Sequence, residues 1–223
     1  MYYMSAFFLK LLALTTMMID HVGAVFFTQY PIFRVIGRLS FPIYCFLLVE
    51  GYFHTKDIRR YALRLLLFAF ISEVPFDYAF FGRITGSHQN IFFTLFLGLM
   101  VIHIMDSLAK ENRLLGFAGA ILIMFLSEYL ATDYGSLGIL YIITFYLLKS
   151  VEGPAKLLLM TFLVAVLNLL LSGGLQNYSV LSAVFIFQYN GSEGPKNQYL
   201  KYGFYIMYPL HLSIIYLVKL LYF

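Results

Sequence analysis

Three ionisable residues lie within the first long apolar segment of the chain, where water cannot solvate them. Asp20 and His21 stand together near its end, and Lys10 lies eleven positions upstream of His21. Because eleven helical residues return to within about 20° of the same face, Lys10 and His21 share one stripe roughly 16 Å apart along a helix. Charged groups within a membrane segment are costly, so function is the default hypothesis for them. The spacing predicts two groups that hold opposite ends of one elongated ligand.

His21 has the chemistry of a general base. The ordinary histidine pKa of about 6.5 lies near working pH, so an imidazole can accept a proton from a hydroxyl or amine nucleophile during acyl transfer. His211, in the last apolar segment, is predicted to reach the same depth and could serve equally well. A hydrogen-bonded structural histidine is the alternative for His21.

The composition indicates a polytopic membrane protein. Of the 223 residues, 61% are hydrophobic and only 12% are charged, which leaves too little polar surface for a soluble globule of this size. We therefore expect a lipid-embedded, all-α transmembrane bundle that forms a single domain over residues 1–223. The net charge of +4 is too modest to predict a nucleic-acid partner. The lone Cys45 excludes an intrachain disulfide and is expected to be a small buried residue.

Hydropathy and helix-breaking residues predict about nine spans with the N-terminus in the cytoplasm. In this orientation Arg34, Arg38, Arg83 and Lys219 lie outside, and the other eleven of the fifteen basic residues lie inside. The fourth, sixth and eighth spans are too short to cross a bilayer comfortably. The predicted spans are residues 7–27, 35–53, 61–81, 91–105, 114–131, 134–148, 155–172, 178–188 and 199–220.

The first two spans are predicted to form an antiparallel hairpin in which positions summing to about 60 lie at equal depth. This register sets Lys10 level with Glu50, and it sets Asp20 and His21 level with Arg38. Each buried charge then has an opposite partner. We predict an Asp20–Arg38 ion pair, with His21 about 100° away on its helix and facing a cavity.

Further polar residues are predicted in the same outer half of the membrane. The third span brings Glu73 and Asp77 there, and the ninth brings His211. Pro42 should interrupt the second helix just past Arg38, and such breaks are tolerated where the backbone lines protein or a water-filled space. A cavity is therefore expected at this depth, with the segment Asp-Tyr-Gly at 133–135 as a candidate for its mouth.

Other kinds of site have weaker support. The chain has no His-x-x-His or Cys-x-x-Cys spacing, and Arg38 would repel a cation, so we predict no metal. Walker, dinucleotide-binding and Gly-x-Ser-x-Gly motifs are also missing. A glycine-rich polar loop at 190–197 could hold a phosphate through its amides and Lys196, although an ordinary turn is the more common outcome for such a sequence.

Several stretches of the chain match a known family. They are Ile-Asp-His-Val-Gly at 19–23, Gly-Arg-Leu-Ser-Phe-Pro at 37–42, Glu-Gly-Tyr-Phe-His-Thr at 50–55, residues 64–77 ending in Ser-Glu-Val-Pro-Phe-Asp, Gln-Asn at 89–90, Asp-Tyr-Gly at 133–135 and residues 201–212 with Tyr-Pro-Leu-His-Leu. In these stretches the chain resembles the TraX family, which takes its name from a membrane protein that N-acetylates pilin. The first span also resembles a wider group of membrane acyltransferases in which ten residues separate a basic residue from a histidine. Here that pair is Lys10 and His21, with lysine where arginine is usual.

The resemblance implies an enzyme of the bacterial cytoplasmic membrane that moves an acetyl group from cytoplasmic acetyl-CoA to an amine or hydroxyl of a peptide or envelope sugar. His21 would act as general base or transient acyl carrier. The supporting catalytic residues would be Asp20, Arg38 and His211. The residues expected near the acyl donor are Lys10, Arg34, Glu50, Lys196 and Lys201.

Two other functional classes fit the same polar residues. Buried Asp, Glu, His and Arg in a bundle also describe the proton relay of a proton-coupled transporter. Inverted repeats and paired broken helices are not evident in the sequence, which weakly opposes transport. A non-catalytic assembly factor is a third possibility.

Overall fold

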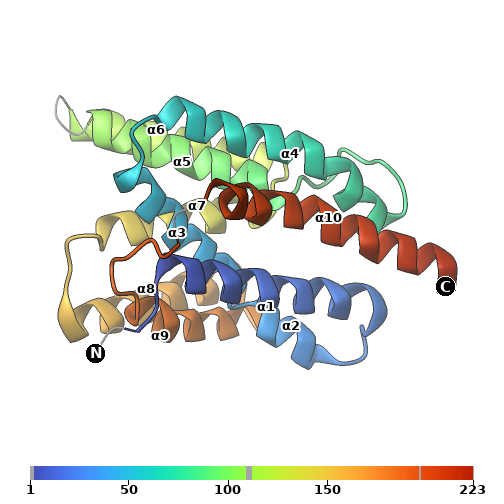
Figure 1. The fold of residues 1–223 in the computed structure, drawn as a ribbon. Helices are drawn as coiled ribbons and strands as arrows, with labels where there is room; N and C mark the ends of the chain where they lie inside the picture. Colours follow the sequence, from blue (N-terminus) through green and yellow to red (C-terminus); the bar gives the residue numbers. More distant parts are fainter. Residues whose placement is uncertain (1–2, 109–111, 196, 223) are drawn as a thin grey trace.

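The computed structural model describes residues 3–108, 112–195 and 197–222, and the regular elements of these segments are all helices, as the sequence predicts (Figure 1). The elements are α1 (Ala6–Phe26), α2 (Pro31–Gly37), α3 (Ser40–His54), α4 (Ile58–Phe81), α5 (Ile91–Leu108), α6 (Arg113–Tyr129), α7 (Gly135–Leu147), α8 (Gly153–Leu171), the 3₁₀ helix η1 (Gly174–Leu181), α9 (Ser182–Phe187) and α10 (Gln198–Tyr222).

Local sequence signals explain where several helices begin and end. The Ser5, Asp57 and Asn112 side chains cap the first amides of α1, α4 and α6. Gly82 ends α4 in the left-handed conformation, with φ of 69°, which glycine adopts without steric cost. These caps set the helix lengths and so fix which residues reach each end of the bundle.

The second pass through the bundle is broken, as predicted. Helix α2 ends at Gly37 and α3 begins at Ser40, so Arg38 lies in the short break between them. Pro42 is the third residue of α3, a first-turn position that does not need an N–H group. Arg38 thus follows directly on α2, which packs against α1 and η1.

The helices pack in a bundle around α3, of which most residues are buried. Helix α3 contacts α1, α5 and α7, while α10 lies along α1 and α4 (Figure 1). Two ends can be defined. The N-terminal end contains loops 55–57, 148–152 and 188–195, and the histidine end contains loops 27–30, 82–90 and 130–134 (Figure 1).

The predicted number of spans is not confirmed. Five of the described helical segments are long and apolar enough to cross a membrane, namely Ala6–Phe26, Ile32–His54, Ile91–Leu108, Gly153–Leu171 and Gln198–Tyr222. The remaining passes are shorter, or, like α4, carry charged residues that lower their hydropathy. The cytoplasmic placement of the N-terminus stays a prediction.

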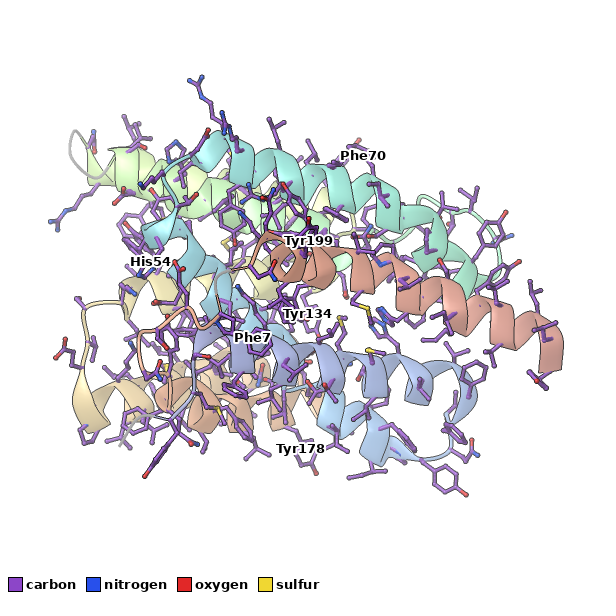
Figure 2. All side chains as sticks on the ribbon, viewed as in Figure 1. Phe7, His54, Phe70, Tyr134, Tyr178 and Tyr199 are labelled. Atoms are coloured by element: carbon purple, nitrogen blue, oxygen red, sulfur yellow. The ribbon has the colours of Figure 1, made fainter. Side chains whose placement is uncertain are left out.

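The outer surface is apolar, as a lipid-facing surface must be. Phe70 of α4 and Tyr178 of η1 point away from opposite sides of the bundle, whereas Tyr134 lies inside it (Figure 2). Helices α8 and α10 are largely exposed and carry many leucines on that surface, including Leu170 and Leu221. Large exposed apolar surfaces of this kind indicate contact with a membrane.

Helices α1 and α2 approach each other closely at Gly37. A Cβ atom added there would overlap the Oδ1 atom of Asp20. We expect Gly37→Ala to lower the free energy of unfolding by about 1–3 kcal/mol, because overpacking forces the two helices apart. Thermal unfolding in detergent can be followed with a thiol-reactive dye, since Cys45 is fully buried.

Gly203→Ala in α10 is the matched control, because an added Cβ meets nothing within 4 Å there. Equal unfolding midpoints for the two variants would contradict the close approach of α1 and α2.

Candidate active site

The centre of the site is the buried carboxylate of Asp20. Its Oδ2 atom accepts a hydrogen bond from Arg34 Nη1 at 2.5 Å, and its Oδ1 atom accepts one from Arg38 Nη2 at 2.8 Å. The predicted Asp20–Arg38 pair is therefore confirmed. Arg34, expected beside the acyl donor, here takes the second oxygen of the same carboxylate. A carboxylate held by two guanidinium groups is orientated on both sides.

Arg38 is held at more than one atom. Its Nη1 atom donates to Gln176 Oε1 at 3.1 Å, and its Nε atom donates to the Arg34 carbonyl at 3.3 Å. Gln176 in turn donates to the Tyr141 hydroxyl, which also hydrogen-bonds to the Asn168 side chain. This network extends the site into α7, α8 and η1. Sequence reasoning missed Gln176, because η1 has no helical periodicity that would set its register against α2.

His21 and His211 form a hydrogen-bonded pair. The Nδ1 atom of His21 lies 2.7 Å from Nε2 of His211, and the two rings are stacked with their centroids 4.9 Å apart. His211 Nδ1 lies 2.8 Å from the Met207 carbonyl, which can only accept, so this nitrogen carries a proton. In neutral His211 the Nε2 atom is then an acceptor, and His21 donates from Nδ1. The Nε2 atom of His21 is consequently the basic nitrogen.

A cavity of about 350 Å³ opens beside these groups at the histidine end. It is lined by the predicted residues Asp20, His21, Arg34 and Arg38, and also by Asp133 and Tyr134 from the loop after α6. The prediction that His21 faces a cavity while Asp20 turns to the neighbouring helix is confirmed. The volume suits a small acyl group and its acceptor, and is at the lower end of the range for small-molecule sites.

His88 also lines this cavity, although the sequence did not predict it as a site residue. Its Nε2 atom lies 3.5 Å from Oδ1 of Asp133, which joins the loop after α4 to the loop after α6. The hydrogen bond to Asp133 raises the pKa of His88 above its ordinary value, although burial opposes this effect. The signal that could have found it is the neighbouring Gln89–Asn90 stretch.

Glu73 and Asp77 lie at the histidine end, as predicted, but they do not line the cavity. Glu73 accepts hydrogen bonds from Asn90, and Asp77 accepts one from the Thr85 amide at 2.7 Å. Both carboxylates lie at the histidine end but hold the loop of residues 82–90. That loop carries His88, so the two residues position the cavity wall from behind.

The residues expected near the acyl donor do not form a single cluster at the N-terminal end. Glu50 forms an ion pair with Lys149, so the predicted pairing of Glu50 with Lys10 is wrong. The reason is that α3 packs against α7 as well as α1, and Lys149 follows α7 directly. Lys10 and Lys201 lie near enough for their charges to interact. Lys196 lies outside the described residues.

The glycine-rich loop at 190–197 behaves as a structural turn over its described part. The carbonyls of Ser192 and Glu193 accept hydrogen bonds from the amides of Ala6 and Phe7, the first two residues of α1. Its backbone thus caps a helix. Among the described residues no group of three or more His, Cys, Asp or Glu side chains is arranged to hold a metal ion.

Comparison with known proteins identifies the family. The family model described as TraX protein matches residues 5–219, which include every site residue named above. The chain belongs to the TraX family. A curated relative, the probable fimbrial assembly protein FimC, serogroup H1, of Dichelobacter nodosus, is 31% identical over 95% of this chain and 94% of its own length.

A second relative is an uncharacterized protein of Rickettsia prowazekii (strain Madrid E). It is 27% identical over 67% of this chain and 58% of its own length. No solved structure matches this TraX-family chain.

Substitution of Arg38 should lower the stability of the protein. We expect Arg38→Ala to destabilise the protein by about 3 kcal/mol, because the buried carboxylate loses one of its two partners. Arg38→Lys should cost less, since it keeps the charge but cannot reach Gln176 and Asp20 together. Thermal unfolding measures both variants.

Arg83→Ala is the control, because Arg83 is an exposed arginine in a loop at the same end. An unfolding midpoint for Arg38→Ala that matches the control would contradict a stabilising role for the buried Asp20–Arg38 ion pair.

The His88–Asp133 pair predicts a pH dependence of stability. Because the folded pKa of His88 is raised, the stability that the pair contributes is fully present below about pH 6.5 and is lost as pH rises through the raised pKa. The difference in unfolding midpoint between wild type and His88→Gln, measured by circular dichroism, should therefore be larger at pH 5.5 than at pH 8.5.

Asp133→Asn should remove the same pH-dependent difference, since it eliminates the partner carboxylate. A difference that grows with rising pH would have the wrong sign for this pair.

Proposed function

We propose that this TraX-family protein is an integral membrane acetyltransferase of the bacterial cytoplasmic membrane, which moves an acetyl group from acetyl-CoA to an amine or hydroxyl acceptor. The observation that supports this most directly is the chain of hydrogen bonds from Met207 through His211 to His21. It leaves a basic nitrogen on His21, a residue that lines a cavity of about 350 Å³. Acetyl transfer to an amine or alcohol requires such a base.

In the proposed reaction, each bond that forms or breaks and the proton that moves can be assigned. Acetyl-CoA supplies the activated acyl carbon as a thioester. His21 Nε2 takes the proton of the acceptor amine or hydroxyl as the new bond to that carbon forms, and the same proton passes to the departing thiolate as the carbon–sulfur bond breaks. His211 holds His21 in the required tautomer, as an orienting third group does in other base-assisted transfers.

The arginines have a separate task. Arg34 and Arg38 line the same cavity, and Asp20 fixes both of them. Positive groups fixed before the reaction stabilise negative charge that develops on the acyl oxygen without reorganising during the step. Asp20 therefore serves as an orienting residue, and the guanidinium groups supply the electrostatic stabilisation.

The acceptor is proposed from the relative with the broader coverage. That protein is named for fimbrial assembly, and on this ground we place the acceptor group on a peptide subunit in preference to an envelope sugar. The cavity lies beside the loops of the histidine end. A flexible peptide terminus could enter there, whereas a folded domain could not.

The proposal predicts a kinetic pattern for the two histidines. Transfer of radiolabelled acetyl from acetyl-CoA to a peptide amine by purified protein should fall by about 10²–10⁴-fold in kcat in His21→Ala, because the general base is lost. His211→Gln should retain more activity and should shift the pH profile, since His21 stays but its tautomer is no longer fixed.

His54→Gln is the control, because His54 is an exposed histidine at the N-terminal end, away from the cavity. A wild-type rate in His21→Ala would exclude His21 as the base. Assembly of fimbriae that survives His21→Ala would favour a non-catalytic assembly role.

A further inference from the structure

Three cationic side chains from three different helices gather at the N-terminal end, at the opposite end of the bundle from the histidine pair. They are Lys10 of α1, Arg64 of α4 and Lys201 of α10. The charge of Lys201 acts on Lys10, and the charge of Arg64 acts on Lys201. The carboxylate of Glu193 also acts on both lysines. The cluster therefore carries a net positive charge from these four side chains.

Arg64 is held in place but has unused hydrogen-bonding capacity. Its guanidinium carbon lies 5.4 Å from the centre of the Tyr61 ring, a cation–π distance, and the group also interacts with Tyr205. Within the described part of the chain, its Nε atom is buried and has no hydrogen-bond partner. A buried donor without an acceptor is costly, so an acceptor from a ligand would relieve that cost.

The helix ends increase the positive potential. Helices α1, α4 and α10 begin at Ala6, Ile58 and Gln198, so each of the three cations lies within the first two turns of its helix. None of these helices has an acidic residue in its first turn. The N-terminal end of a helix is its positive end, so cations placed there favour an anion beside them. At α4 the Asp57 carboxylate already caps the first turn, whereas α1 begins at the uncharged Ser5.

The same three helices also surround His21. Helix α1 carries His21 eleven residues after Lys10, and α10 carries His211 ten residues after Lys201, which corresponds to roughly 15–16 Å along each helix. Helix α4 contributes Phe80, whose ring lies 5.2 Å from that of His21. The cationic cluster and the histidine pair thus lie at two levels of one three-helix interface.

We infer that Lys10, Arg64 and Lys201 form a binding site for a phosphate-bearing group. Cations from separate helices surround a multiply charged anion better than a single carboxylate, and the Arg64 Nε atom is a donor for a phosphate oxygen. If the proposed acetyl transfer holds, on which this last step rests, the phosphates of the acyl donor occupy the site while its thioester reaches His21. The headgroup of an anionic phospholipid has the same chemistry and is the other source.

The test measures binding in purified full-length protein, with no acyl transfer needed. Coenzyme A without an acyl group is titrated by calorimetry in a neutral detergent, and retained phosphatidylglycerol is counted by native mass spectrometry. The variants are Arg64→Gln and Lys201→Gln, with Arg64→Lys to keep the charge. Arg60→Gln is the matched control, since Arg60 is an exposed arginine of the same helix.

We expect Arg64→Gln and Lys201→Gln each to weaken coenzyme A binding at least tenfold and to reduce its dependence on salt, while Arg60→Gln leaves both unchanged. Arg64→Lys should bind between wild type and Arg64→Gln. If the two Gln variants lose phosphatidylglycerol but bind coenzyme A normally, the phosphate site stands and its occupant is a lipid headgroup. Unchanged binding of both probes in correctly folded variants would overturn the site.

The two proposals can fail separately. If Arg64→Gln still transfers acetyl in a His21-dependent way with an unchanged KM, the phosphate site is contradicted and the proposed enzyme is supported. If coenzyme A binding depends on Arg64 but no acetyl transfer occurs, the phosphate site is supported and the proposed enzyme is contradicted.

Discussion

The buried carboxylate of Asp20 is the interaction on which the site depends. An unpaired carboxylate in a membrane interior is very costly, so Arg34 and Arg38 must both reach it. They can do so because Gly37 lets α2 approach α1 closely and because the helix breaks at Arg38. Once Asp20 turns toward α2, the next residue on the helix turns about 100° away. The direction of His21 toward His211 of α10 therefore follows from the position of the ion pair.

Sequence reasoning predicted the parts that short-range geometry determines. The hairpin register brought Asp20 to Arg38, and Pro42 indicated the break, because adjacent antiparallel helices joined by a short loop have little freedom. The same register did not give the partner of Glu50, twelve residues further, because α3 also packs against α7 and Lys149 follows that helix. Equal depth does not determine which of two neighbouring helices a side chain faces.

The partners that come from distant segments could not be predicted from the sequence. Gln176 reaches Arg38 from a 3₁₀ helix, and His88 reaches Asp133 across two loops. Neither pairing has a periodicity or a spacing that marks it. The equal depth of His21 and His211 was predictable, but the hydrogen bond between their rings depends on how α10 is rotated against α1, which only the packed structure fixes.

The two ends of the bundle differ in how their charges are balanced. At the histidine end Asp20 has two arginines, and Asp133 has His88, so the polar groups are fixed before any ligand arrives. Such preorganisation is what a catalytic cavity requires, since the groups do not have to move during the reaction. At the N-terminal end, Lys10, Arg64 and Lys201 outnumber the carboxylate of Glu193 that acts on the two lysines. An excess of one charge attracts an anion and does little chemistry itself. This difference is consistent with the proposed function, in which the N-terminal end captures the ligand and the histidine end rearranges the bonds.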